Sequence, residues 1–308
     1  MWELRNTRFD PLRLLGQWLI VCIGLHATLG FAQAPEDWRE WALRMDKAQQ
    51  SLNYDATMVI DAGRGDWDLV DVSQRVGPGG PEQQWISLND AGRRQVRTAQ
   101  GVSVLGPEGD QRIGRSPQLR AGVLLQQLDQ SYQITVGPRE RVAGRRAVRL
   151  TLQPISADRY GLRLWIDADT GLPLRSDRTG EGQSVLERRM ITRLTVHGFA
   201  GISAAVAAPA SITELGWALP SGFRLIGSAL TVPGITGARQ WVISDGVAWV
   251  SVYQMSLAKG LVIEGNGWRH GAMSQVTLKN GDEWFYLLGD VPPQTLVNVA
   301  QAAIAALP

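Results

Sequence analysis

The chain has 308 residues, 44% of them hydrophobic, which is enough to fill the core of one large domain or two ordinary ones. Its formal net charge is only +2, and charged residues make up 19%, so the composition gives no support to a nucleic-acid-binding protein. One Cys and three His leave little material for a zinc cage, a thiol redox pair or a cysteine nucleophile.

Residues 1–32 are expected to be a signal peptide that is removed on export. Three arginines within the first thirteen residues precede an uncharged run over residues 14–34, which closes with small residues. Cleavage after Ala32 fits the small-residue pattern, and cleavage after Ala34 is the alternative. An uncleaved membrane anchor is the competing interpretation, because the run approaches the ~18–20 residues that span a bilayer.

Removal of this segment changes the inventory of reactive side chains. It takes away Cys22 and one histidine, and it leaves His197 and His270. A mature chain without cysteine suits an oxidising compartment in which the protein needs no disulfides. We therefore expect a periplasmic protein.

The mature chain begins with an expected amphipathic helix over residues 36–52. Apolar side chains recur there at spacings of three and four: Trp38, Trp41, Ala42, Met45, Ala48 and Leu52. Residues 53–61 then alternate between apolar and polar side chains, as in a half-buried strand. Further strands are expected around residues 67–76, 83–88 and 94–105, with turns at 77–81 and 106–110.

A second helix is expected over residues 116–130, with Ser116 as N-cap and Pro117 at the first helical position. Strands resume after it around residues 148–152, 160–166 and 186–196. In the last of these the alternation predicts a shared face for Leu186, Met190, Leu194 and Val196. Residues 33–196 are therefore expected to form a large antiparallel half-barrel sheet with helices, the main part of an α+β fold.

Residues 197–212 are rich in Ala, Gly and Ser and carry no charge, which is typical of an interdomain linker. Residues 213–308 are expected to form a smaller α+β domain. A hairpin is predicted there with Asn280 and Gly281 as its two-residue turn, and a C-terminal helix is predicted behind Pro292 and Pro293.

Catalytic and metal-binding signatures are missing from the sequence. The chain has no G-x-S-x-G, Walker, H-E-x-x-H, G-x-G-x-x-G or C-x-x-C motif. The acidic pair Asp167 and Asp169 falls at an expected turn, where Asp caps backbone groups. We expect no cofactor, no metal and no enzymatic activity, and a hydrolase with an unrecognised site is the least favoured alternative.

Tryptophan is unusually frequent, with twelve residues in the chain. Trp67, Trp85 and Trp165 fall on expected strands of the large sheet, where they can line a concave groove for an acyl chain or an apolar peptide. Filling the core is the alternative for each of them. Arginines also cluster, Arg93 and Arg97 among them, and guanidinium groups suit phosphates or carboxylates.

Several segments resemble one known family. Residues 124–177, LLQQLDQSYQITVGPRERVAGRRAVRLTLQPISADRYGLRLWIDADTGLPLRSD, resemble the core of the RseB/MucB proteins, the periplasmic regulators of the envelope-stress sigma-E system. The segments LPSGFRL (219–225), ISDGVAWVSVY (243–253) and LLGDVPPQTLVNVAQ (287–301) are similar to the small domain of that family. Within the second segment, Ser244, Asp245 and Gly246 are expected to shape a turn.

The resemblance implies a large domain shaped like the lipoprotein-carrier half-barrel, joined to a smaller α+β domain. It also implies binding to the periplasmic domain of a membrane-spanning anti-sigma factor, similar to RseA or MucA, which the protein shields from proteolysis. Lipopolysaccharide or mislocalised lipoprotein is then expected to displace the protein. A periplasmic lipid or lipoprotein carrier is the competing interpretation, and association with a second copy stays open.

The expected roles of individual residues combine the resemblance with their chemistry. Acyl chains and lipid phosphates are expected at Trp67, Trp85 and Trp165 with Arg93 and Arg97. The surface for the anti-sigma factor is expected on the small domain, at Trp241, Trp249, Tyr253 and Trp284.

Overall fold

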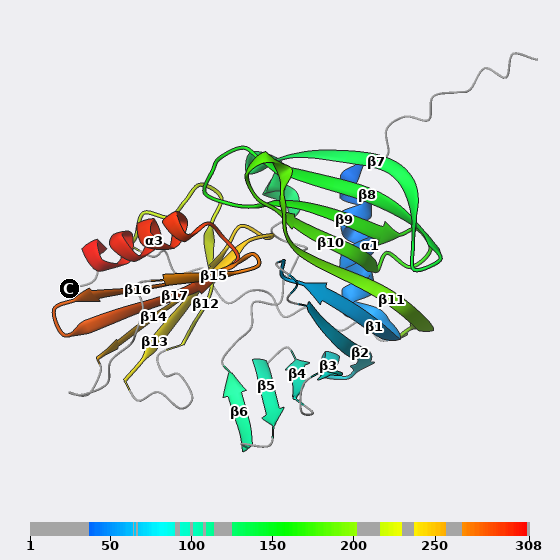
Figure 1. Cartoon of the computed structure of the whole chain (residues 1–308), viewed down its shortest axis with the longest axis horizontal. Coiled ribbons are helices and arrows are strands. Elements are labelled where there is room, and N and C mark those ends of the chain that lie inside the picture. Colours follow the sequence, from blue (N-terminus) through cyan, green and yellow to red (C-terminus); the bar gives the residue numbers. More distant parts are fainter. Residues whose placement is uncertain are drawn as a thin grey trace, which may run out of the picture. The chain divides into compact units, whose positions relative to one another are not determined.

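The computed structural model describes residues 37–63, 65, 67–89, 93–98, 101–106, 109–113, 125–201, 216–229, 237–256 and 267–306. All of these residues belong to one compact unit. They form a large sheet from residues 52–199 and a small sheet from residues 224–289, both antiparallel (Figure 1). The expected α+β class is therefore confirmed, whereas the expected signal peptide over residues 1–32 lies outside the described residues.

The large sheet has eleven described strands, in the order β6-β5-β4-β3-β2-β1-β11-β10-β9-β8-β7. Because β1 pairs with β11, the first and last strands along the chain lie side by side inside the sheet, and β6 and β7 are its edges. The strands are β1 Leu52–Asp61, β2 Trp67–Gly77, β3 Gly80–Ser87, β4 Arg94–Thr98, β5 Gly101–Gly106, β6 Gly109–Ile113, β7 Tyr132–Val142, β8 Arg145–Pro154, β9 Gly161–Asp167, β10 Pro173–Thr179 and β11 Val185–Phe199.

Helix α1 (Trp38–Ser51) confirms the first expected helix. Asp37 is its N-cap, and the Asp37 carboxylate accepts a hydrogen bond of 3.0 Å from the Arg39 N–H. Trp41, Ala42 and Ala48 are buried in the two apolar clusters of the large sheet. The spacing of three and four therefore gives α1 one face that packs on the sheet.

The second expected helix differs from the prediction where it is described. Residues 116–124 lie outside the described residues, and Leu125–Gln130 form a 3-10 helix (η1) instead of an α-helix. The Ser131 N–H donates to the Leu128 carbonyl at 3.0 Å, and β7 begins at the next residue. The i to i+3 winding suits this position, because a short segment must bring Leu128 into the core before the strand starts.

The two faces of the large sheet differ in character. We call the face on which α1 packs the helix face; it carries Leu150, Leu164 and Ile166. The opposite face, here the outer face, carries polar residues such as Thr57 and Asp71, which are paired across β1 and β2. Side chains alternate between the faces along each strand, so the pairing register decides which of them meet.

A β-bulge in β11 breaks this alternation. The register with β1 passes from Thr57 opposite Arg193 to Met58 opposite Ile191, which leaves Thr192 as the extra residue. Leu194 and Val196 consequently lie on the helix face and Met190 on the outer face. The single face expected for Leu186, Met190, Leu194 and Val196 is therefore wrong. Ile191, which the alternation did not select, is buried on the helix face.

Strand β11 also runs into the expected linker. His197–Phe199 belong to the strand, and Phe199 pairs with Leu52 at the start of β1. The His197 Nε2 lies 2.6 Å from the Asp55 carboxylate, which additionally accepts two hydrogen bonds from Arg75. These contacts extend the pairing beyond the point at which the sequence loses its strand pattern.

The small sheet has the order β12-β13-β14-β17-β16-β15, and helix α3 (Pro293–Ala306) covers one of its faces (Figure 1). α3 confirms the predicted C-terminal helix, and it starts at Pro293. Leu296, Val299 and Ala303 of α3 are buried against Phe285 and Leu287. The strands are β12 Arg224–Ala229, β13 Arg239–Ser244, β14 Trp249–Ser256, β15 Gly267–His270, β16 Met273–Asn280 and β17 Glu283–Gly289.

The predicted hairpin is confirmed, but its turn is shifted by one residue. Asn280 pairs with Glu283, so the two connecting residues are Gly281 and Asp282. Gly281 has a φ of 60°, whereas Asp282 has no positive φ. This pattern is that of a type II′ turn, which requires a positive φ only at its first central residue.

Acid is expected to destabilise the fold through Asp177. Its carboxylate is fully buried and accepts two hydrogen bonds each from Arg175 and Arg188. Burial alone would raise the pKa of Asp177, but the two guanidinium groups hold it below the ordinary value of 3.8. The resulting stabilisation is present above that ordinary value and is lost as the pH falls below it.

In urea titrations, the Asp177→Asn variant is expected to lose less unfolding free energy than the wild type between about pH 5 and about pH 3. Asp129→Asn serves as the control, because Asp129 forms a solvent-exposed pair with Arg39. An acid dependence identical in the wild type and in Asp177→Asn would contradict the prediction.

Candidate functional site

The three tryptophans expected to line one groove lie on two different faces. Trp85 pairs with Val72, whose side chain is buried on the helix face. Trp67 pairs with Asp61, and Trp165 pairs with Arg175, both on the outer face. Of the three, Trp85 alone is on the helix face, so they do not form one lining.

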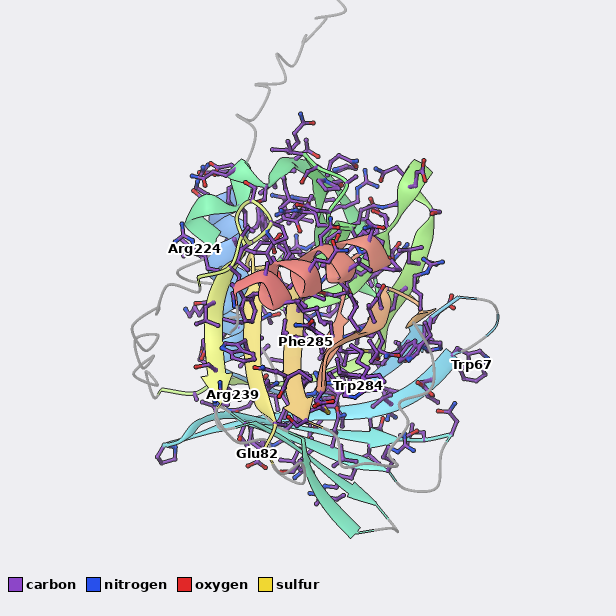
Figure 2. All side chains as sticks on the ribbon, turned by 90° about the vertical axis from the view of Figure 1, so that its left-hand side faces the viewer. Trp67, Glu82, Arg224, Arg239, Trp284 and Phe285 are labelled. Carbon is purple, nitrogen blue, oxygen red and sulfur yellow. The ribbon has the colours of Figure 1, made fainter. Side chains whose placement is uncertain are left out.

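The two outer-face tryptophans have different surroundings. Trp165 is 3% exposed, its Nε1 donates to Glu140 at 2.8 Å, and the Arg175 guanidinium stacks on its ring at 4.0 Å. Trp67 is 55% exposed at the start of β2 and projects from the sheet (Figure 2). The structure therefore gives Trp165 a packing role and leaves the Trp67 indole accessible.

A chain of amide hydrogen bonds fixes Trp85 on the helix face. The Gln74 side-chain NH₂ group lies within hydrogen-bond distance of three carbonyls at the end of α1: Ala48 (3.3 Å), Gln49 (3.1 Å) and Leu52 (2.8 Å). Gln83 donates to the Gln74 Oε1 at 2.6 Å and accepts from the Trp85 Nε1 at 3.3 Å. Because Gln74 is fully buried, this chain ties the indole to the helix.

Arg97 lies on the same face as Trp85. Its guanidinium stacks on the Trp85 ring at 4.3 Å, and it follows from the pairing of Arg97 with Gln83 that both side chains face α1. Arg93 is exposed just before β4, and its carbonyl accepts a hydrogen bond from the Ser87 N–H at 3.1 Å. The structure thus brings two of the five expected ligand residues, Trp85 and Arg97, into contact.

The aromatic residues expected at the partner surface also divide between two faces. Trp241 lies on the α3 face of the small sheet, where its ring meets Trp217 edge-on at 5.1 Å. Trp249, Tyr253 and Trp284 lie on the opposite face, here the open face of the small sheet. Tyr253 is directly opposite Tyr286, with ring centroids 6.0 Å apart.

Trp284 is half-buried on this open face, and the Lys279 ammonium lies 5.4 Å from its ring centroid. Its neighbour Phe285 points the other way, into the core under α3 (Figure 2). Strand alternation therefore places three of the four expected partner residues on one aromatic surface and packs the partly buried Trp241 against the core.

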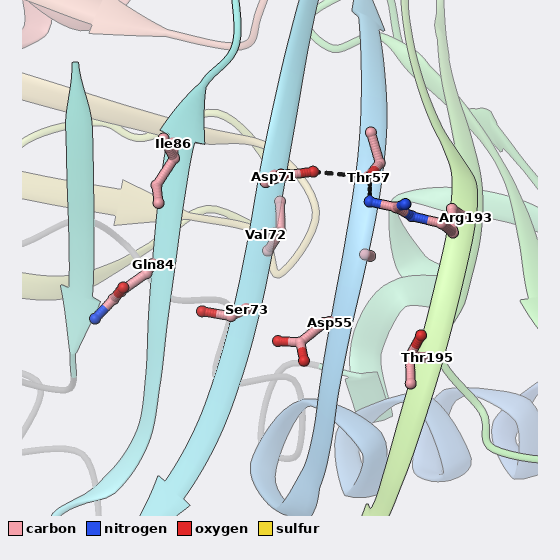
Figure 3. A pocket seen from close by; sticks show the side chains of 10 residues that line it. Asp55, Thr57, Asp71, Val72, Ser73, Gln84, Ile86, Arg193 and Thr195 are labelled. Atoms are coloured by element: carbon pink, nitrogen blue, oxygen red, sulfur yellow. Dashed lines mark hydrogen bonds between the residues drawn. The ribbon is translucent and has the colours of Figure 1, made fainter. Parts of the chain in front are cut away.

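The outer face of the large sheet has a hollow of about 290 Å³ (Figure 3). Thr57 is one of its lining residues: its hydroxyl donates to Asp71 at 2.7 Å and accepts from Arg193 at 3.2 Å. Hydroxyl groups of Ser73 and Thr195 line the same hollow. Apolar residues line it as well, so the hollow combines polar and apolar groups.

A turn of the small sheet is held by side chains of the large-sheet part. The Asp245 Oδ1 accepts hydrogen bonds from the N–H groups of Val247 (2.8 Å) and Ala248 (2.7 Å), which confirms the expected turn role. Its Oδ2 accepts from Arg159 at 2.6 Å and from the Tyr132 hydroxyl at 3.0 Å. We call Tyr132, Arg159 and Asp245 the Asp245 latch.

The Asp245 latch is shielded from water. The side chains of Arg159 and Asp245 are 1% and 0% exposed. Arg159 also donates to Asp158 through Nε at 2.7 Å, and its Nη2 donates to the Ser221 carbonyl. Arg159 is thus bonded to both parts of the fold, which makes it a central tie between them.

A second buried pair supports the same turn. Arg178 of β10 donates to the Val247 carbonyl at 2.7 Å and to the Asp290 carboxylate. The other Asp290 oxygen accepts from the Trp249 N–H at 2.7 Å. Burial raises the pKa of Asp290, and the Arg178 charge opposes that rise.

Sequence reasoning did not single out Tyr132, Arg159, Arg178 or Asp290. Tyr132 and Arg159 lie in the segment 124–177, and Asp290 lies in the segment 287–301, two of the segments that carried the family resemblance. The similarity of these two segments to the family was therefore the sequence signal that could have drawn attention to these buried residues.

In the part of the chain that the structure describes, no group of three or more His, Cys, Asp and Glu side chains could hold a metal ion. Among the same residues, no helix is long and apolar enough to cross a membrane. The groups that do gather are aromatic rings, guanidiniums and buried ion pairs, which are suited to binding.

Comparison with known proteins identifies the family. The MucB/RseB N-terminal domain matches residues 37–213, and the MucB/RseB C-terminal domain matches residues 212–303. This chain belongs to the MucB/RseB family. The Asp245 latch therefore joins the two MucB/RseB domains, with Tyr132 and Arg159 in the N-terminal one and Asp245 in the C-terminal one.

Individual MucB/RseB proteins match along most of their length. The sigma factor AlgU regulatory protein MucB of Pseudomonas aeruginosa is 26% identical over 302 residues, which cover 92% of this chain and 95% of that protein. The sigma-E factor regulatory protein RseB of Salmonella typhimurium is 23% identical over 283 residues, covering 84% and 88%. A crystal structure of MucB in complex with MucA(peri) has a TM-score of 0.63 at 26% identity and covers 87% of this chain and 98% of that one.

Proposed function

We propose that this protein is a periplasmic negative regulator of a sigma-E-type envelope stress response. It binds the periplasmic domain of a membrane-spanning anti-sigma factor and shields that domain from proteolysis. The match to both MucB/RseB domains carries the proposal, together with the solved complex of the relative MucB with MucA(peri). The open face of the small sheet, with Trp249, Tyr253 and Trp284, is the proposed contact surface.

Protection of this kind follows mass action. At a free concentration ~100 times the Kd, about 1% of the anti-sigma factor stays uncovered, which corresponds to a bias of ~2.7 kcal/mol. A ligand that binds more tightly to the partner-free form of the protein shifts this equilibrium toward uncovered anti-sigma factor. The size of the shift depends on the difference between its affinities for the two forms. We propose lipopolysaccharide or mislocalised lipoprotein as that ligand.

The helix face of the large sheet supports the proposed binding of lipopolysaccharide or lipoprotein. Trp85 lies there with Met58 and Ile60, which pack on the same apolar cluster, and Arg97 supplies a cation. The same surface would serve a periplasmic lipid or lipoprotein carrier, which is the second candidate function. A carrier binds lipid and has no need of an anti-sigma factor, so the two functions predict different partners.

Calorimetric titration of the purified protein with the periplasmic domain of its own organism's anti-sigma factor tests the proposal. We expect binding in the micromolar range or tighter, and we expect lipopolysaccharide to weaken it. No binding at micromolar concentration, with lipid still bound, would support the carrier instead. The cytoplasmic domain of the same anti-sigma factor is the matched negative control.

A protease-protection assay tests the shielding itself. The anti-sigma periplasmic domain is incubated with its site-specific protease, with and without the purified protein. Cleavage is expected to slow in proportion to the fraction bound. An unchanged rate at saturating protein would contradict shielding even if the two chains bind.

A further inference from the structure

Arg97 stands out on the helix face as a cation whose direct contacts, Gln95 and Trp85, are neutral. Its Nε and Nη2 both donate to the Gln95 side-chain oxygen, at 3.1 and 2.9 Å. Its guanidinium lies over the Trp85 ring at 4.3 Å. No carboxylate of the described residues pairs with it, whereas Arg145, Arg159, Arg175, Arg178 and Arg188 each have one.

Among the described residues, the Arg97 guanidinium donates hydrogen bonds to Gln95 alone. A guanidinium has five N–H donors, and the bonds to Gln95 engage two of them. Those bonds and the stacking on Trp85 fix the plane of the group, so the free N–H groups keep one direction. A planar, pre-oriented fork of this kind is suited to a bidentate phosphate or carboxylate.

The surroundings of Arg97 disfavour its charge. Burial, together with the positive charge of Arg189, lowers its pKa to about 10. Arg189 lies on the same helix face, because it pairs with Ile60, and its own partner is Glu187 at 2.7 Å. An anion bound by Arg97 would therefore relieve an unfavourable excess of positive charge.

The groups beside Arg97 are apolar as well as cationic. Trp85, Met58 and Ile60 all pack on the apolar cluster that contains Tyr54 and Val72 of the helix face. The Gln74–Gln83 chain holds the indole in place, so the stacked pair is supported from α1. A ligand that fits this combination carries one anionic group attached to an apolar portion.

We propose that Arg97, stacked on Trp85 and held by Gln95, binds the phosphate or carboxylate group of an amphiphilic ligand whose apolar part lies along Trp85 and Met58. Arg189 is the second cation of this site. The inference deepens the proposed function, because it gives the proposed lipid-binding surface a defined anion site. It rests on the proposed function only for the biological role of that site.

Calorimetry with three probes tests the site. The full-length purified protein is titrated with dodecyl phosphate below its micelle concentration, with inorganic phosphate and with dodecanol. Dodecyl phosphate is expected to bind to the wild type about tenfold more tightly than to Arg97→Gln, equivalent to about 1.4 kcal/mol, because the variant loses the charge-assisted hydrogen bonds to the phosphate. Arg97→Lys keeps the charge without the fork and is expected to fall between them.

Arg193→Gln is the matched control. Arg193 lies on the outer face, where its described partner is the neutral Thr57 hydroxyl, so its loss is expected to leave dodecyl phosphate binding unchanged. Equal unfolding free energies of the wild type and Arg97→Gln show that the variant is folded. Equal affinities of these two proteins for dodecyl phosphate would overturn the proposal.

The titrations also distinguish a free phosphate from a phosphate that is attached to an apolar chain. Inorganic phosphate that binds as tightly as dodecyl phosphate, and depends on Arg97, would keep the anion site but overturn the apolar half of the proposal. Binding of the anti-sigma periplasmic domain to Arg97→Gln without amphiphile is expected to match the wild type. If that partner does not bind to the wild type but dodecyl phosphate does so through Arg97, the proposed function fails while this site stands.

Discussion

Replacing Arg159 by Met is expected to lower the free energy of unfolding by about 3–5 kcal/mol. The substitution keeps much of the side-chain volume but leaves the carboxylate of Asp245 buried without its cation. It also removes the hydrogen bonds to Asp158 and to the Ser221 carbonyl. Urea unfolding followed by circular dichroism at neutral pH measures the loss.

The exposed pair of Arg146 and Asp169 supplies the control. Its side chains are 69% and 55% exposed, so Arg146→Met is expected to cost less than about 1 kcal/mol. A loss for Arg159→Met as small as that of the control would show that the Asp245 latch does not hold the turn. Asp245→Asn keeps a turn acceptor, and it is expected to lose less than Arg159→Met.

Two tryptophans of the small sheet are expected to differ in role, one in stability and the other in partner binding. Trp241→Ala is expected to lower the free energy of unfolding by about 3 kcal/mol, because its indole packs on the core beside Trp217. Trp284→Ala is expected to weaken binding of the anti-sigma periplasmic domain about 30-fold, equivalent to about 2 kcal/mol, as for an aromatic hot spot. Urea unfolding and calorimetric binding are measured on both variants.

Trp67→Ala is the matched tryptophan control for this comparison. Trp67 is largely exposed on the outer face of the large sheet, so its loss is expected to change neither quantity appreciably. Wild-type affinity in Trp284→Ala would remove that residue from the proposed contact surface. A stable, fully folded Trp241→Ala would contradict the core role of Trp241.

The Asp245 latch also bears on the proposed regulation. Arg159 and Arg178 from the N-terminal domain both hold the turn that precedes Trp249 at the start of β14. Trp249 in turn shares the open face with Tyr253. The buried ion pairs therefore set the position of the strand that carries part of the proposed contact surface.

Local patterns predicted most of the elements correctly. The periodicity of three and four located α1 and α3, and alternation located β1 and the later strands. The errors occurred where an element depends on its neighbours. The helix expected up to residue 130 ends as the 3-10 helix η1, and β11 runs on to Phe199, which pairs with Leu52 of β1.

The candidate site was less predictable than the fold. Trp85 and Arg97 were selected by type, and their contact depends on the pairing of β3 with β4. Trp165 was selected by the same reasoning, but its strand parity places it on the outer face beside Arg175. Residue type indicated which side chains could bind a ligand, and register decided which of them lie together.

By itself, the sequence determined the classes of element, the membership of the MucB/RseB family and the turn formed by Asp245. Tertiary structure alone decided that Asp245 also meets Arg159, 86 residues away, and Tyr132, 113 residues away. The physical reason is that periodicity and turn chemistry act over a few neighbouring residues. Strand register, the bulge at Thr192 and the partners of buried charges are fixed only when distant segments pack together.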